Sequence, residues 1–563
     1  MRKLQFVLAS VLTLAFLLPV ISNGQNLVRV APFSGANYLN AVIMGDTLPN
    51  GARRDTNAAY VLQRGGLYLA NGIIRNTGWI FRLQTHDTTA GVSKPVVFLY
   101  PTSAGGNPPG QLVDIRRDII LKNIILSGYF EPDPAEITKL QGSLFNTSVA
   151  GTNITFDGCI FTNTNGNHVR TDQAPRTVRI INCIFGNMGY LGRSNFGAGK
   201  GIDVRGGSVD SLIMMNNTFV NWQDRIIRHF ASTANIQYLR FEHNTCVNGI
   251  SYHGMLSLGR MGRRGIIRDN LLIDPFAAGQ DTDAVRQAEF TDHGELDAFG
   301  FPRMVWIFSN RNDSTNWLIK NNYYRVTPAG QSFYDSASIL PIVANPALVV
   351  GKPLTYHLNS RIGADSVTAF QTTTAVLPNT PRFPDAMLKW YRRPTASGGA
   401  NKTKATGNWT AAFDFDRKPY QYWRDTLNCA YPTSNAIYTA GTGGYPVGDL
   451  NWFPTRYTAW LVDPVSGVTT KGDGIPESFS LNQNYPNPFN PSTRISFSLP
   501  TEGFAKLAVY NILGQKVATL VNEQLEAGYH ELDFDASKLT TGVYFYRLEV
   551  GKNSAVKKMM LVK

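Results

Sequence analysis

An eight-residue phrase recurs along the middle of the chain and restricts its fold more than any other feature. Clear copies begin at residues 154, 178, 212, 239 and 265, with an earlier copy at 119 and a later one at 317. Aligned on their sixth position, or on the fifth in the copy at 119, the copies give a column that consists of Asn123, Cys159, Cys183, Asn217, Asn244, Asn270 and Asn322. Two places on, a second column consists of Ile125, Phe161, Phe185, Phe219, Cys246, Leu272 and Tyr324. The copies recur roughly every 24 to 36 residues, and the last interval is about twice as long, with room for two coils.

Apolar and polar residues alternate within each copy, which is the period of a strand. Strands that recur with like residues in register are typical of a β-solenoid, in which each coil covers the open edge of the previous one. An asparagine at a turn can hydrogen-bond to the asparagine of the next coil and to backbone groups, and the aromatic column packs in the core. The pattern predicts an all-β protein built on a right-handed, single-stranded parallel β-helix. A β-sandwich is the alternative, but hairpin turns between the copies are scarce.

The first residues predict export. Arg2 and Lys3 precede an apolar run over 4–21, and small residues at 22–24 offer a cleavage site, so residues 1–24 are expected to form a signal peptide. A membrane anchor is the alternative, although Pro19 interrupts the run and no second apolar span follows.

The chain contains only four cysteines, without the spacing of a metal site. Cys159 and Cys183 are expected on adjacent coils, either bonded to each other or as buried free thiols.

Composition divides the remainder of the chain. We expect an N-terminal cap with the first coils over 25–113, β-helix coils over 114–330, terminal coils and a C-terminal cap over 331–464, a linker over 465–477 and a last domain over 478–563.

The last domain carries the most specific motifs. It opens on FSLNQNYPNPFNPST at 479–493, continues through LAVYNILGQKV at 507–517 and GVYFYRL at 542–548, and closes on KKMMLVK at 557–563. In this order the motifs resemble the type A sorting domain of the type IX (Por) secretion system. The resemblance implies a small antiparallel, immunoglobulin-like β-sandwich and recognition by the type IX machinery. It also implies export across the outer membrane of a Bacteroidetes-like bacterium, with release or linkage to surface lipopolysaccharide.

The charge balance indicates acidic partners. The formal net charge is +13, and charged residues make up 17% of the chain against the common ~25%. A basic exported protein is suited to anionic polysaccharide or lipopolysaccharide, whereas the absence of a lysine run argues against nucleic acid. The coils also resemble the pectate-lyase-like superfamily by architecture. That scaffold carries lyases, hydrolases and non-catalytic adhesins, so function has to be argued from a site.

A second strand between the copies contains many charged residues. Because neighbouring strands lie ~4.8 Å apart, we expect these residues to form one strip across the coils, which has no lysine apart from Lys200 at its edge. Cleavage of a uronate chain by β-elimination needs a cation against the carboxylate and a base for the neighbouring proton. We assign catalysis to Arg205, Arg228, His253 and Asp203, and substrate contacts to His168, Arg170, His229, Arg260 and Trp222. The alternative is that these arginines pair with neighbouring aspartates on an outer face.

Two other functions and a metal remain open. Gly201–Asp203, Gln223–Asp224 and Tyr252–Gly254 follow the order of polygalacturonase motifs. However, one aspartate of a pair is missing, and an inverting hydrolase needs two carboxyl groups ~6.5–9.5 Å apart. Exposed tryptophans such as Trp222 and Trp317 could instead stack on sugars in a non-catalytic adhesin.

An acidic insertion over 280–300 offers Asp281 and Asp283 as Ca²⁺ ligands, although its spacing also suits a solvated loop. We therefore expect a secreted or cell-surface protein that acts on or binds acidic polysaccharide. A lyase is the leading enzymatic hypothesis.

Overall fold

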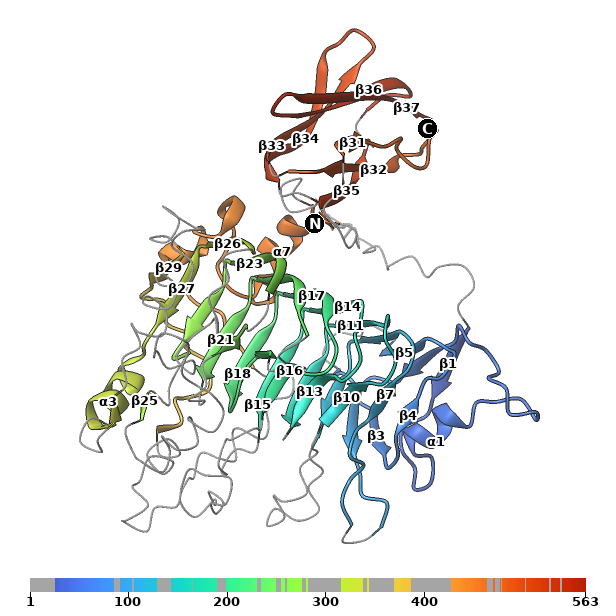
Figure 1. The fold of residues 1–563 in the computed structure, drawn as a ribbon, viewed down its shortest axis with the longest axis vertical. Coiled ribbons are helices and arrows are strands. Elements are labelled where there is room, and N and C mark those ends of the chain that lie inside the picture. The colour runs from blue at the N-terminus through green and yellow to red at the C-terminus, as the bar shows by residue number, and fades with distance from the viewer. Residues whose placement is uncertain are drawn as a thin grey trace, which may run out of the picture.

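Three parallel sheets stack coil upon coil through most of the chain. The structure is a computed structural model, and it describes residues 26–85, 92–103, 106–128, 143–164, 166–189, 199–229, 234–249, 255–258, 261–275, 280–281, 315–337, 342–343, 369–385, 427–462, 469–470, 476, 478–501, 503–525, 528–536 and 539–562. The predicted signal peptide lies outside these residues. The successive strands rise side by side along the stack (Figure 1), and the predicted parallel β-helix is confirmed.

Each full coil contributes one strand to every sheet in turn. The first sheet is formed by β1 (Leu27–Val30), β2 (Ala59–Leu62), β5 (Phe81–Thr85), β8 (Ile119–Lys122), β11 (Asn153–Asp157), β14 (Thr177–Ile181), β17 (Val209–Met215), β20 (Ile236–Glu242), β23 (Met261–Arg268) and β26 (Asn316–Lys320). The second is formed by β3 (Leu67–Ala70), β6 (Val96–Leu99), β9 (Ile125–Ser127), β12 (Ile160–Thr164), β15 (Ile184–Met188), β18 (Thr218–Trp222), β21 (Thr245–Gly249), β24 (Leu271–Ile273), β27 (Asn322–Arg325) and β29 (Phe370–Thr372). The third is formed by β4 (Ile74–Arg75), β7 (Val113–Ile115), β10 (Ser143–Thr147), β13 (Asn167–Thr171), β16 (Lys200–Val204), β19 (Ile227–His229) and β22 (Leu256–Ser257).

The aromatic column packs inside the coils. The rings of Phe161 and Phe185 stack with centroids 4.7 Å apart, and those of Phe185 and Phe219 with centroids 5.0 Å apart. Cys159 and Cys183 are buried free thiols on adjacent coils. At the N-terminal end, the short helix α1 (Leu39–Met44) places Leu39 and Ile43 against the same core.

The asparagine column lies in the turn between the first and second sheets, as predicted. Asn217 Oδ1 accepts a hydrogen bond from the backbone N–H of Cys183 at 2.9 Å. Asn244 Oδ1 accepts from the backbone and side-chain amides of Asn217, and Asn270 Oδ1 does the same for Asn244. The Asn244 side chain also donates to the carbonyl of Met214 at 3.0 Å. The ladder therefore pairs polar groups that the turn would otherwise leave buried without partners.

A second asparagine column, which was not predicted, lies at the fourth position of β12, β15, β18 and β21, near the end of each strand. Asn163, Asn187, Asn221 and Asn248 all have positive φ, between 54° and 60°. The side-chain amides of Asn187, Asn221 and Asn248 each donate to Oδ1 of the asparagine one coil earlier at 3.1–3.2 Å. Its sequence signal is an asparagine two residues after four of the seven members of the second column, namely Phe161, Phe185, Phe219 and Cys246.

The earliest copy of the phrase is shifted by one residue from the sequence alignment. Phe161 pairs with Leu126 rather than Ile125, and Asn123 lies against Gly158 instead of Cys159. Asn123 has φ of 54° and occupies the left-handed turn position. Asparagine is one of the few residues other than glycine that tolerates this conformation. An asparagine therefore indicates the turn, but it does not show whether it occupies the left-handed position or the next position, which carries the hydrogen-bonded column.

The long interval before the last copy contains no additional coil in the first two sheets. β23 pairs directly with β26, and β24 pairs directly with β27. The prediction of two coils was therefore wrong, because the extra residues form an insertion between adjacent coils. β25 (Gln280–Asp281) lies in that insertion and pairs antiparallel with β28 (Ile342–Val343), which follows β27 in the chain.

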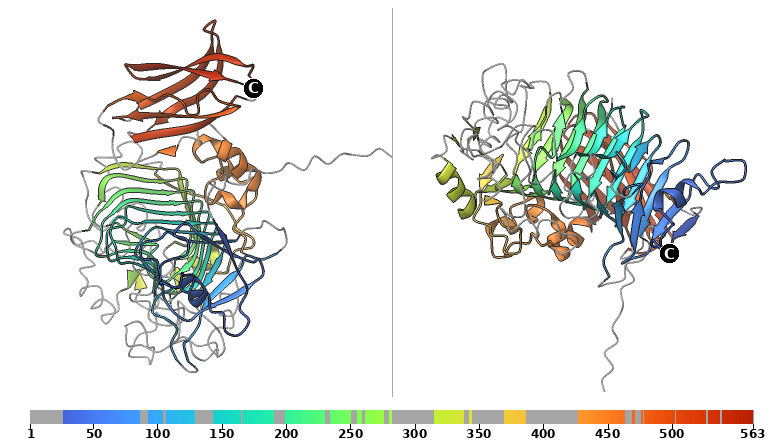
Figure 2. Two further views of the ribbon diagram at one scale, coloured as in Figure 1. Left: turned by 90° about the vertical axis from the view of Figure 1, so that its right-hand side faces the viewer. Right: turned by 90° about the horizontal axis from the view of Figure 1, so that it is seen from below.

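Residues 427–462, which we call the strap, run along the outer side of the second sheet. The strap contains short 3₁₀ turns and ends in α7 (Pro454–Val462). Its Leu427, Tyr431 and Phe453 pack against outward-facing Val247 and Leu271. Figure 2 shows the strap in orange beside the green coils. A further helix, α3 (Pro328–Ala337), follows β27.

The C-terminal residues form two antiparallel four-stranded sheets. One contains β30 (Thr469–Thr470), β31 (Ser480–Leu481), β32 (Ser492–Leu499) and β35 (Gly528–Asp535), and the other contains β33 (Gly503–Asn511), β34 (Lys516–Leu525), β36 (Gly542–Val550) and β37 (Asn553–Leu561). Residues such as Phe497, Leu507 and Tyr546 form a core of their own. The predicted antiparallel domain is confirmed.

Candidate functional site

Polar residues occupy one register position through the third sheet. Backbone pairing aligns Arg75, Asp114, Asn146, Arg170, Asp203, Arg228 and Ser257 on successive strands. Their neighbours Val169, Ile202 and Ile227 point into the core, so the strand alternation directs this column away from it. The predicted strip therefore exists for Arg170, Asp203 and Arg228.

Five charged residues gather where β16 meets β19, and we call them the third-sheet cluster. Asp203 and Lys200 lie on β16, Arg228 lies on β19, and Asp224 and Arg225 precede β19. Arg228 Nη1 lies 3.3 Å from Asp203 Oδ1, and Lys200 Nζ lies 3.2 Å from Asp224 Oδ2. Arg225 Nη1 lies 3.1 Å from the other oxygen of Asp224.

Burial controls the electrostatics of this cluster. The Arg228 side chain retains 12% exposure, against 4% for Lys200 and none for Asp203. Burial lowers the pKa of Lys200, and the carboxylate of Asp224 offsets part of that shift. Burial also lowers the pKa of Arg228, opposed by Asp203. Buried paired charges contribute little net stability, and a lysine with a lowered pKa is suited to proton transfer.

The other residues predicted for catalysis, substrate binding or metal binding are distributed differently. Arg205 Nη1 lies 4.0 Å from Asp203 Oδ2, with 43% of its side chain exposed at the edge of the cluster. Arg170 forms an ion pair with Asp172, with Nε 2.7 Å from Oδ1. His253, Arg260 and Asp283 lie outside the described residues, and Asp281 lies on β25.

Three predicted substrate contacts are not supported, because their side chains are buried and turned toward the core or toward backbone. Trp222 is 0% exposed inside the coils. His168 is equally buried, with its ring edge-on to Phe185 and its Nδ1 3.0 Å from the carbonyl of Lys200, and burial lowers its pKa to about 4. His229 is 5% exposed, and its Nε2 contacts the carbonyl of Ala234. Contacts with neighbouring coils hold these rings in buried positions, which local sequence alone does not show.

Lys200 and Asp224 belong to the third-sheet cluster but not to the predicted catalytic set. Lys200 was expected at the edge of the strip, yet it begins β16 and pairs in register with Asn167. A signal was present in the sequence, because Lys200 lies three residues before Asp203, and Asp224 lies four residues before Arg228 on the next coil.

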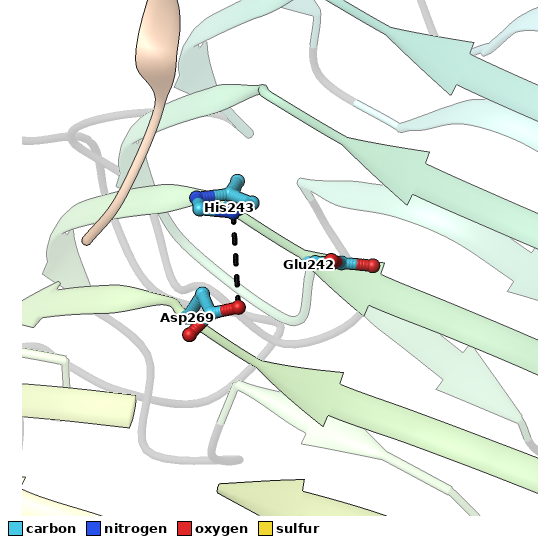
Figure 3. A group of neighbouring side chains, drawn as sticks. All are labelled: Glu242, His243 and Asp269. Carbon is cyan, nitrogen blue, oxygen red and sulfur yellow. Dashed lines mark ion pairs between the residues drawn. The ribbon is translucent and has the colours of Figure 1, made fainter. Parts of the chain in front are cut away.

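A second cluster lies at the turn between the first and second sheets. It consists of Glu242, His243 and Asp269, whose ligand atoms lie within 4.8 Å of one another, all buried. Figure 3 shows His243 and Asp269 facing each other from neighbouring coils, with the Glu242 carboxylate turned to one side. Glu242 is held by Arg240 and Arg268, at 2.5 Å and 2.8 Å. The sequence signal is an acidic residue and a histidine where other coils have asparagine or glycine beside the ladder.

The strap covers this corner of the coils. Thr442 N–H donates to Asp269 Oδ1 at 2.9 Å, and the carbonyl of Gly448 lies 3.3 Å from His243 Nδ1. The ring of Trp460 meets the His243 ring edge-on at 5.8 Å. The strap is therefore held on the coils by polar contacts as well as by its apolar core.

These features define a parallel β-helix, with a charged cluster on one sheet and an antiparallel β-sandwich at its C-terminal end. Residues 483–563 match the family model described as a secretion system C-terminal sorting domain. No curated protein matches the chain. The sorting domain marks a protein that the type IX secretion system exports to the cell surface or the extracellular space. None of the helices in the described ranges is long and apolar enough to cross a membrane.

Proposed function

We propose that the third-sheet cluster binds an acidic polysaccharide and cleaves it by β-elimination. One observation supports this proposal: Lys200, which is buried and has a lowered pKa, lies on the coil next to that of Arg228, which keeps some exposure. Buried ionisable groups with shifted pKa values concentrate at functional sites. A cationic site on an exported basic protein suits a uronate-containing chain.

The reaction divides into roles that the cluster can fill. Arg228, with Arg205 at the edge, binds the uronate carboxylate, which acidifies the hydrogen on the neighbouring carbon. Neutral Lys200 removes that proton, the carbon–hydrogen electrons form a double bond, and the bond to the departing glycosidic oxygen breaks. That oxygen then takes up a proton from water. Asp224 Oδ2 lies 3.2 Å from Lys200 Nζ and positions the neutral amine, and Asp203 positions Arg228 through their ion pair.

The pH dependence follows from the role of the base. Burial lowers the pKa of Lys200, so the neutral amine is available at a lower pH than for an exposed lysine. The rate is expected to rise with pH through that lowered pKa.

Ultraviolet absorbance of unsaturated products tests the proposal. The full chain is mixed with polygalacturonate, alginate and glycosaminoglycans, with and without Ca²⁺. Loss of a general base predicts a rate decrease of about 10²-fold or more in Lys200→Met, with a comparable decrease in Arg228→Lys. Lys122→Met is the matched control, because Lys122 lies on β8 of the first sheet, away from the third-sheet cluster. Absence of product with every polymer, or equal rates in Lys200→Met and the control, refutes the lyase.

Non-catalytic binding is the second candidate, and the exposed arginines favour it. The side chains of Arg75, Arg116, Arg170 and Arg205 along the third sheet are 33–50% exposed. Such a surface would retain a polyanion without bond cleavage, in a salt-dependent manner. Retention on an acidic glycan column without unsaturated product supports this function. Reducing ends without absorbance would instead indicate hydrolysis involving Asp203 and Asp224.

A further inference from the structure

The corner beneath the strap contains two buried acceptor atoms that face each other. His243 Nε2 and Asp269 Oδ2 lie 3.7 Å apart, and their side chains are 1% and 0% exposed. Across the residues that the structure describes, neither atom has a hydrogen-bond partner. Buried polar atoms are normally paired, so this arrangement calls for a ligand.

The surroundings orient both side chains. His243 Nδ1 lies 3.3 Å from the Gly448 carbonyl, so Nδ1 donates a ring proton there, and Nε2 is directed at Asp269. Histidines that bind metals commonly donate their other ring N–H to a carbonyl in this way. Asp269 is fixed likewise, because its Oδ1 accepts from the backbone N–H of Thr442 at 2.9 Å.

The separation of the two atoms suits a shared metal ion better than a shared proton. A nitrogen–oxygen hydrogen bond would bring them to about 2.7–3.2 Å. Zinc binds histidine nitrogen and carboxylate oxygen at about 2.0–2.2 Å in tetrahedral geometry, which places two ligand atoms somewhat more than 3 Å apart. The 3.7 Å between His243 Nε2 and Asp269 Oδ2 is close to that second arrangement.

We propose that His243 and Asp269 bind a divalent transition-metal cation such as Zn²⁺ beneath the strap, with Glu242 as a third donor. An imidazole beside carboxylates favours such a cation over Ca²⁺, which prefers oxygen ligands alone. Arg240 and Arg268 hold the Glu242 carboxylate, and Arg268 Nε also lies 3.8 Å from Asp269 Oδ2. These positive charges oppose a cation, so the site binds more weakly than a four-ligand structural zinc site.

The metal would tie neighbouring coils together beneath the strap. His243 follows β20, and Asp269 follows β23 on the next coil. Each also contacts the strap, through Gly448 and Thr442. Because metal binding stabilises the state that contains the site, Zn²⁺ is expected to raise the unfolding temperature of the β-helix.

Equilibrium dialysis tests the site directly. The full chain, carrying no polyhistidine tag, is stripped with a chelator, dialysed against Zn²⁺ and analysed for bound metal. His243→Asn and Asp269→Asn are expected to weaken zinc binding at least about tenfold, since even outer contacts of a metal site change affinity by 10–100-fold. Asp114→Asn, which alters an ion-paired carboxylate on the third sheet, is the matched control and should bind normally. Equal zinc binding in all four proteins, or none in any of them, overturns the proposal.

A second measurement covers the case in which a ligand variant does not fold. Co²⁺ replaces Zn²⁺ and quenches tryptophan fluorescence at short range, and the Trp460 ring lies 5.8 Å from that of His243. We expect saturable quenching of the unmodified chain that Zn²⁺ reverses and that Trp460→Phe largely abolishes. Quenching that is identical in Trp460→Phe places the bound metal elsewhere and refutes the site. The pair would then be an imidazolium–carboxylate ion pair.

Discussion

Replacement of one ladder asparagine should destabilise the β-helix by an amount that its hydrogen bonds set. In Asn244→Ala, the backbone N–H of Asn217 loses its acceptor at 3.1 Å, and the carbonyl of Met214 loses a donor at 3.0 Å. A buried group left unpaired costs about 1–3 kcal/mol, and an ordinary hydrogen bond contributes about 0.5–1.5 kcal/mol. The free energy of unfolding should therefore fall by roughly 2–4 kcal/mol.

Urea denaturation followed by tryptophan fluorescence measures this loss. All nine tryptophans precede residue 461, so the signal reports the coils and the strap and excludes the sorting domain. Asn107→Ala, in an exposed loop, is the matched control and should change the midpoint little. A double variant with Asn270→Ala should lose less than the sum of the single variants, because the two side chains share bonds. A midpoint for Asn244→Ala equal to that of the control would refute the ladder as a source of stability.

Three further perturbations test other parts of the fold. Gly158→Ala places a methyl group 2.3 Å from Asn123 Oδ1 at φ of 64°, whereas Gly151→Ala, at φ of 76°, meets no atom within 4 Å. In both variants the left-handed conformation should lower the free energy of unfolding, measured by thermal unfolding, by about 1–2 kcal/mol. The decrease should be larger in Gly158→Ala, and equal decreases would contradict the predicted contact. Burial raises the pKa of Asp449 to about 7, above its unfolded value. Asp449 therefore makes its whole contribution to the free energy of unfolding at pH values below its pKa in the unfolded chain. That contribution is lost as the pH rises to about 7. Asp449→Asn should flatten that part of the stability profile, and an unchanged slope would exclude Asp449 as its source. The four cysteines are buried and free, so a thiol reagent should label all four only after unfolding, whereas labelling of the folded chain would show that they are accessible.

The strand repeat and the sorting motifs allowed much of the architecture to be predicted from the sequence. Stacking brings Cys183, Asn217 and Asn244 into one column because each coil must pair its edge with the next. That requirement is local and repeated, so it can be read from sequence alone. The motifs of residues 483–563 were equally specific, because they depend on their order and not on distant contacts.

The tertiary structure alone decided where individual side chains point and which distant residues meet. Asn123 could fill either turn position until pairing with the next coil settled the register. The burial of Trp222 and the pairing of Lys200 with Asp224 depend on neighbours from other coils. The contact of Thr442 with Asp269 joins residues 173 positions apart. The sequence by itself determined a stack of coils, because periodic patterning carries that information; the charged cluster and the strap contacts arise only when several coils bring unlike residues together.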